Sequence, residues 1–153
     1  MGLFSFIKGV GAKVFGSKEA AAPEAEKAQV KASALLAHVQ ALGLSFNSLT
    51  ISLTADGHVH VKGEVDQQSD SEKIVLALGN VEGVEQVDNE MTVAVPAPEA
   101  RYYTVVAGDS LSKIAKEMYG DYAHYPAIFE ANKPMLQDVD LIYPGQVLRI
   151  PAL

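Results

Sequence analysis

Groups able to do catalytic chemistry are few in this chain. Its 153 residues include no cysteine, and the four histidines are scattered at His38, His58, His60 and His124. No serine, histidine and acidic residue are spaced in a way that predicts a catalytic triad. Nucleophilic and general-base catalysis therefore have little support, and we expect the chain not to be an enzyme.

Two of the histidines share one face of a predicted strand. His58 and His60 are two residues apart, with Asp56 nearby, and alternate residues of a strand point to the same side. Imidazole is a ligand of divalent metals, but two imidazoles do not complete a closed site. The alternative interpretation is that the intervening valines are buried while both histidines face water. We predict that His38 and His124 are surface residues.

Composition and charge exclude further classes. The net charge of −7 argues against nucleic acid as a partner. The absence of cysteine is typical of a reducing compartment. The start, MGLFSFIKGVGAKVFG, lacks the unbroken apolar core of an export signal, and no apolar run is long enough for a transmembrane segment. We therefore expect a cytoplasmic, monomeric protein with an acidic middle part.

The last third of the chain predicts a set of elements that position several candidate binding residues. A strand near residues 102–106 ends at Ala107-Gly108, and Asp109 or Ser110 is placed to cap a helix. That helix ends at Gly120. A second helix over about residues 124–132 and a strand over residues 147–150 follow. The apolar face of the first helix is predicted to be formed by Leu111, Ile114, Ala115 and Met118.

This strand–helix–helix–strand order resembles the LysM domain. The resemblance is carried by YTVVAGDSLSKIA, by Asn132-Lys133-Pro134 and by IYPGQVLRIP. It implies a groove that binds N-acetylglucosamine chains. A cytoplasmic location removes that polymer, and the alternative is that this module docks against the other module of the chain. In the alternative interpretation Asp109 is a helix cap and Tyr143 packs in the core or a turn. The resemblance implies groove walls formed by Gly108, Asp109, Ser110 and Leu111, and by Pro134, Met135, Ile142 and Tyr143.

The middle of the chain predicts a second small module. A helix over residues 30–42 precedes two strands, residues 49–54 and 58–65, which are joined by the hairpin signal Asp56-Gly57. A second helix over residues 69–78 is ended by Gly79. A third strand, residues 84–95, is predicted to face the core through Val87, Met91, Val93 and Val95.

That order, with the motifs DGHVHVKG and GVEQVDNEM, resembles the BON domain. The predicted fold class is therefore α+β, with an αββαβ domain followed by a βααβ domain. The predicted divisions are an N-terminal segment packing on the BON-like domain (1–22), the BON-like domain (23–95), a linker (96–101) and the LysM domain (102–153).

Taken whole, the chain is similar to the family of bacterial cytoplasmic potassium-binding proteins, which join these two modules. MGLFSFIK, LALGNVEGV and IFEANKPMLQ add to the resemblance. It implies K⁺ as the ligand with no organic cofactor, compaction on binding, and a role as sensor, buffer or adaptor in ionic stress. The implied ligands are main-chain oxygens of Ile7, Val10, Gly79, Val81 and Val84.

Elementary chemistry agrees with carbonyl ligands. Potassium suits several neutral carbonyl oxygens that replace its water shell, and the last carbonyls of a helix are unpaired and partly negative. Residues 7–11 and 79–84 offer such oxygens beside glycines. The alternative is that Gly79 and Gly83 only end a helix and start a turn. We expect Gly79→Val to abolish binding by forbidding the turn, and Glu82→Gln to have little effect.

The sequence is also compatible with binding to phospholipid or to peptidoglycan. The apolar spacing near the N-terminus predicts one side of a helix, which either packs on the modules or lies on a phospholipid surface. The LysM resemblance also fits an envelope adaptor that binds peptidoglycan. The predicted helix face is formed by Leu3, Phe4, Ile7, Val10, Val14 and Phe15.

Overall fold

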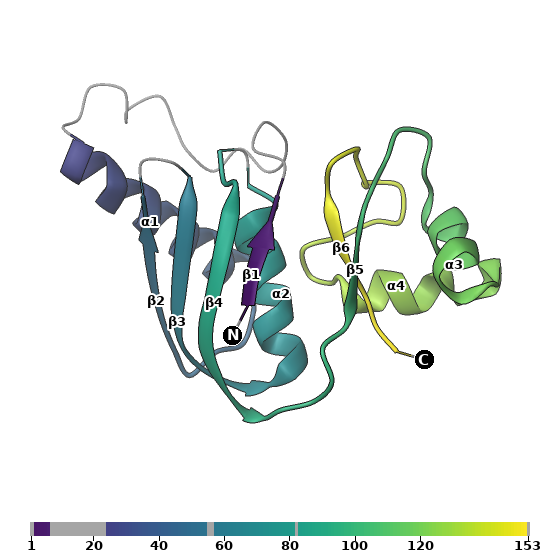
Figure 1. The fold of residues 1–153 in the computed structure, drawn as a ribbon, viewed down its shortest axis with the longest axis horizontal. Coiled ribbons are helices and arrows are strands. Elements are labelled where there is room, and N and C mark those ends of the chain that lie inside the picture. The colour runs from purple at the N-terminus through teal and green to yellow at the C-terminus, as the bar shows by residue number, and fades with distance from the viewer. Residues whose placement is uncertain (1, 7–23, 55–56, 82, 153) are drawn as a thin grey trace.

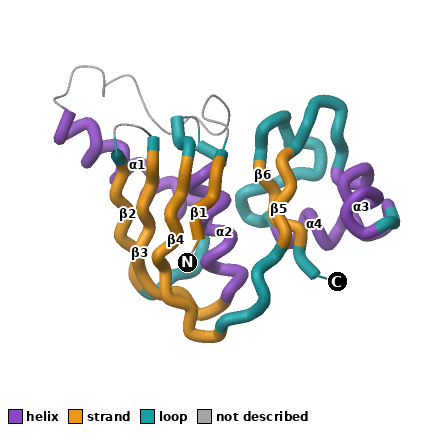
Figure 2. The backbone as a smooth tube through the Cα atoms, in the orientation of Figure 1, coloured by secondary structure: helices purple, strands orange, loops and turns teal. Residues whose placement is uncertain are grey.

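Two α/β units lie side by side, each with its own sheet (Figure 1). The structure is a computed structural model and describes residues 2–6, 24–54, 57–81 and 83–152. Figure 2 shows the four-stranded sheet of the first unit beside the two-stranded sheet of the second. The α+β fold class predicted from the sequence is confirmed.

The first unit contains a sheet in the order β1-β4-β3-β2. β2 and β3 form an antiparallel hairpin, β3 and β4 run parallel, and β1 lies antiparallel to β4. Both helices cover the same face of this sheet (Figure 1). Its elements are β1 (Gly2–Ser5), α1 (Glu24–Leu42), β2 (Ser48–Leu53), β3 (His58–Gln67), α2 (Gln68–Gly79) and β4 (Gln86–Val95).

The alternating sequence of β3 and β4 decides which side is buried. Val59, Val61 and Val87 are fully buried beneath the helices, while the residues between them remain partly exposed on the other face. Alternate strand residues point to opposite faces, so one polar and one apolar side result. Val95 departs from the prediction, because it is 56% exposed where β4 leaves the helix-covered core.

The N-terminal helix prediction was wrong for the residues that the structure describes. Gly2–Ser5 form strand β1, paired with β4 through the register Phe4 opposite Val87. A strand here supplies backbone partners to an edge of β4 that would otherwise be open. It also directs Phe4 and Phe6 to the same side, where Phe6 is buried. The other predicted positions of that face, Ile7 among them, lie outside the described residues.

Element boundaries differ slightly from those predicted. α1 begins at Glu24, earlier than the predicted start near residue 30, and β4 begins at Gln86 rather than at residue 84. Residues 83–85 instead form the turn into the strand. Within the described ranges, no helix is both long and apolar enough to cross a bilayer.

The second unit pairs β5 antiparallel with β6 and packs its helices against this ribbon. Ser110 caps α3, since its side chain accepts a hydrogen bond from the Lys113 N–H. Asp109 has another role: it accepts hydrogen bonds from the Tyr103 hydroxyl at 2.7 Å and from the Val106 N–H at 3.0 Å. The elements are β5 (Arg101–Thr104), α3 (Leu111–Tyr119), η2 (Tyr122–His124), α4 (Tyr125–Ala131) and β6 (Val147–Ile150).

Candidate functional site

The carboxyl end of α2 gathers three of the five predicted carbonyl ligands. Gly79 is the last residue of the helix, and Asn80 caps it by donating its backbone N–H to the Leu76 carbonyl. Val81 and Val84 are fully buried, and the Val84 N–H donates to the Val81 carbonyl at 3.1 Å. A carbonyl oxygen has two lone pairs, so that of Val81 keeps one acceptor position. The partial negative charge of a helix end favours a cation here.

The structure gives Gly79 a different role from the one predicted. Its φ is not positive, whereas Gly83 in the following turn has a φ of 100°. A Cβ added to Gly79 would instead overlap the ring of Phe6. Gly79 therefore makes room for the ring of Phe6, which directly follows β1, and the turn itself depends on Gly83.

The N-terminal strand leads directly to this bend. The Phe6 N–H donates to the Glu85 carbonyl at 2.8 Å, and the Phe6 ring lies against Gly79. The structure thus brings the beginning of the chain to the bend after α2. The other two predicted ligands, Ile7 and Val10, lie outside the described residues.

Asn80 also fastens the first unit to the second. Its amide donates to the Val147 carbonyl and accepts from the Val147 N–H, both at 2.8 Å. Asn132 holds Arg149 in the same manner, at 2.9 Å and 2.7 Å. Among the residues that the structure describes, the strand paired with β6 is β5, and two asparagine amides take the place of a further strand along its other edge. No sequence motif singled out Asn80, because its partner is 67 residues away.

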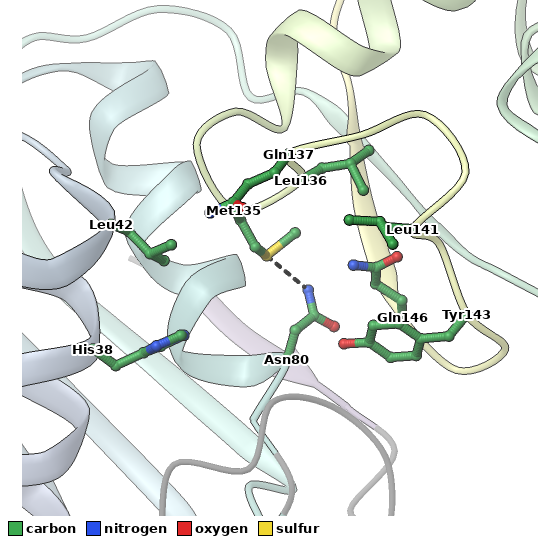
Figure 3. Close-up of a pocket in the computed structure, with 9 residues that line it drawn as sticks. All are labelled: His38, Leu42, Asn80, Met135, Leu136, Gln137, Leu141, Tyr143 and Gln146. Atoms are coloured by element: carbon green, nitrogen blue, oxygen red, sulfur yellow. Dashed lines mark hydrogen bonds between the residues drawn. The ribbon is translucent and has the colours of Figure 1, made fainter.

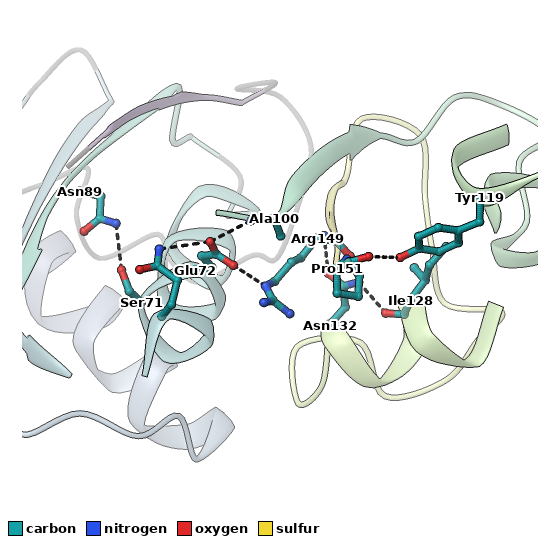
Figure 4. Close-up of polar contacts among 10 residues, drawn as sticks. Ser71, Glu72, Asn89, Ala100, Tyr119, Ile128, Asn132, Arg149 and Pro151 are labelled. Carbon is teal, nitrogen blue, oxygen red and sulfur yellow. Dashed lines mark hydrogen bonds and ion pairs between the residues drawn. The ribbon is translucent and has the colours of Figure 1, made fainter. Parts of the chain in front are cut away.

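A buried ion pair lies farther along the same helix. The Arg149 Nε donates to a Glu72 carboxylate oxygen at 2.6 Å, and the two side chains are 14% and 2% exposed (Figure 4). Glu72 also accepts from the Ala100 N–H at 3.1 Å and from the Gln68 amide at 3.2 Å. A buried carboxylate needs such partners, so Glu72 ties α2 both to β6 and to the segment that joins the units.

Aromatic packing completes the junction. The rings of Phe4 and Tyr102 meet edge to face with centroids 5.2 Å apart. Burial, followed by the negative charge of Glu72, raises the pKa of the Tyr102 hydroxyl far above its usual value. β1, the end of α2 and the β5–β6 ribbon therefore converge at one place.

A cavity of about 270 Å³ lies between the units next to Asn80 (Figure 3). Gln146 is 4% exposed, and its Oε1 has no hydrogen-bond partner among the residues that the structure describes. Burial raises the pKa of Tyr143 and lowers that of His38. The cavity is lined by His38, Leu42, Asn80, Met135, Leu136, Gln137, Leu141, Tyr143 and Gln146.

Both histidines predicted to be surface residues are half-buried. His38 lines this cavity together with residues of the second unit. His124 is half-buried as well, with its ring edge to face against Tyr119 at a centroid distance of 5.8 Å.

The predicted glycan-groove residues divide between two cavities. Met135 and Tyr143 line the junction cavity. Ser110 and Leu111 line a separate cavity of about 310 Å³, together with Ser112, Tyr125, Val139 and Asp140. The remaining predicted residues line neither of these two cavities: Gly108, Asp109, Pro134 and Ile142.

Comparison with known proteins identifies the two units. The BON domain family matches residues 27–95, and the LysM domain family matches residues 103–151. The potassium binding protein Kbp of Escherichia coli O6:H1 is 42% identical over 151 residues, which cover 99% of either chain. The chain belongs to the Kbp family. The two family domains thus meet through the Asn80 and Glu72 contacts.

Other relatives match a smaller part of this chain. An uncharacterized protein of Deinococcus radiodurans is 35% identical over 79% of this chain and 51% of its own length. An esterase of Mycobacterium tuberculosis is 47% identical over 53 residues, which amount to 35% of this chain and 11% of the esterase. A likeness of that extent gives no ground for assigning esterase activity.

Proposed function

We propose that this chain binds a potassium ion at the bend after α2, through the carbonyl oxygens of Gly79, Val81 and Val84 with Ile7 and Val10. The observation that carries the proposal is the likeness to the potassium binding protein Kbp along 99% of both chains. The geometry supports it through a buried bend at a helix carboxyl end, where carbonyl oxygens favour a cation.

The N-terminal ligands have a physical route to the bend. Phe6 is held there by the Glu85 carbonyl and by the surface of Gly79. Ile7 follows Phe6 in sequence, and consecutive Cα atoms are about 3.8 Å apart. Closing the site therefore brings the N-terminal segment and the bend after α2 to one ion.

Ion binding and domain docking share residues in this proposal. Asn80 lies between two proposed ligands and holds β6 through its side chain. An ion that orders residues 79–81 also orders this amide, so K⁺ shifts the population toward the docked form. The protein then acts as a monomeric cytoplasmic sensor, buffer or adaptor in ionic stress.

Calorimetric titration of the metal-free protein with potassium, rubidium and sodium chlorides tests this function. We expect saturable heat with potassium. Gly79→Val should lose binding, because its side chain would overlap the Phe6 ring that leads to the N-terminal ligands. Glu82→Gln should retain binding, since the ligands are main-chain oxygens. Circular dichroism of each variant checks folding. If Glu82→Gln is folded but does not bind K⁺, the Glu82 carboxylate is a ligand and the proposed carbonyl site is wrong.

Binding of N-acetylglucosamine chains is a second candidate function. It is favoured by the LysM match and by Gln146, which lines the junction cavity with Met135 and Tyr143 and whose side-chain oxygen has no hydrogen-bond partner among the described residues. Titration of the labelled protein with chitotriose distinguishes the cavities. Amide shifts at Ser110 to Ser112 indicate one cavity and shifts at Gln146 the other, whereas no shift at millimolar sugar removes this function.

A further inference from the structure

The exposed face of the four-stranded sheet carries a group of metal-ligating side chains that the potassium site does not use. His60 on β3 lies directly opposite Asp88 on β4 in the parallel register, and Glu90 is two residues farther along β4. All three point away from the helices, because their neighbours Val61 and Asn89 are buried on the opposite face. The side chains are 42%, 35% and 33% exposed, in that order.

One imidazole nitrogen faces both carboxylates. The His60 Nδ1 lies 3.3 Å from an Asp88 oxygen and 3.9 Å from a Glu90 oxygen. Ligand atoms of all three residues lie within 4.8 Å of one another. Zinc bonds of about 2.0–2.2 Å in a tetrahedron place neighbouring ligand atoms about 3.4 Å apart. The first separation is close to that spacing, and the second is about 0.5 Å longer.

The surroundings also favour a cation. Backbone pairing of β3 with β4 holds the three Cα atoms, so only side-chain torsions need to adjust. Residues 23–98 carry eleven acidic residues against four lysines, which attracts positive ions to this unit.

We propose that His60, Asp88 and Glu90 form an open binding site for a divalent transition-metal ion of the zinc class. One imidazole with two carboxylates is a ligand set for such ions and differs from the neutral carbonyls proposed for potassium. Water fills the remaining coordination positions, since the site lies at the surface. The sequence pattern suggested His58 and Asp56 as companions of His60. Asp56 lies outside the described residues, and His58 does not belong to the group that the structure brings together.

Zinc titration of the full chain, freed of metal by a chelating resin, tests the site by calorimetry and by the imidazole signals of the histidines. We expect one zinc ion per chain, at least tenfold weaker binding in His60→Gln and Asp88→Asn, and less than a twofold change in the matched control His58→Gln. Each variant is checked for folding by circular dichroism.

A second measurement separates this site from the potassium site. Titration with KCl is expected to give the same affinity in His60→Gln as in the unaltered chain, because the two sites use different residues. Zinc binding that is absent at millimolar metal, unchanged in His60→Gln, or weakened equally in His58→Gln would overturn the proposal.

Discussion

The contact between Asn80 and Val147 offers a quantitative test of how the two units are joined. Asn80→Ala removes one donor and one acceptor that each bond the backbone of Val147 at 2.8 Å, together with a weaker donor contact to the Met135 sulfur at 3.4 Å. A buried intramolecular hydrogen bond contributes about 1 kcal/mol net, so the pair contributes about 2 kcal/mol to docking. Since 1.4 kcal/mol is a factor of ten, the ratio of docked to separated units is expected to fall by at least about 30-fold.

The physical reason is that Val147 has no substitute partner while the units remain docked. It is only 7% exposed, and two unpaired backbone groups would cost about 1–3 kcal/mol each in that state. Separation of the units lets water form hydrogen bonds with the Val147 N–H and carbonyl. Asn80→Ala therefore shifts the equilibrium toward the separated form.

Nuclear magnetic resonance measures this directly. The shift of the Val147 amide and the rotational correlation time of each unit report the docked fraction, in KCl and in NaCl. Asn47→Ala is the matched control, because the Asn47 amide bonds to Asp66 at an exposed position within one unit. Identical relaxation of both units in Asn80→Ala and in the unaltered chain, in both salts, would refute the reasoning.

Three further expectations concern single side chains. Glu72→Gln should loosen docking by leaving Arg149 without its carboxylate partner, and small-angle scattering should show a larger radius of gyration; an unchanged radius contradicts it. The pKa of Tyr103 is raised to about 12, chiefly by its hydrogen bond to Asp109, so Asp109→Ala should lower that pKa toward 10 in an alkaline titration followed at the ring carbon. Burial lowers the pKa of His38 from 6.5, so the unfolded chain takes up this proton first and stability falls as the pH drops below about 6.5. Urea unfolding of His38→Gln should therefore lose less free energy than the unaltered chain between about pH 7.5 and 5.5, and equal losses would contradict the assignment.

Much of the fold was predictable because its signals are local. The alternation of Val59 and Val61 with polar residues indicates a half-buried strand, and both valines are buried as expected. A short polar residue before Leu111 indicates a helix start, and Ser110 caps α3. The bend after α2 was also foreseeable, since Gly79 closes an apolar helical repeat.

The N-terminal strand shows where local patterns fail. The apolar spacing around Phe4 fits a helix, yet residues 2–5 pair with β4. A strand is stabilised by hydrogen bonds to a distant segment. No local sequence pattern shows whether the edge of a sheet is free to pair with it. For the same reason, the sequence predicts a role for Gly79 in its own backbone turn, whereas the structure shows that Gly79 leaves room for the Phe6 ring.

The sequence by itself determined the two domain types, the position of the bend and the supply of carbonyl oxygens beside it, because helix ends and turns are properties of neighbouring residues. Only the tertiary structure decided that Asn80 would bind β6, that Glu72 would meet Arg149, and that His60 would face Asp88 and Glu90 rather than act with His58. Each of these contacts joins residues far apart in the chain, and their partners are selected by packing and strand register, which no single segment contains.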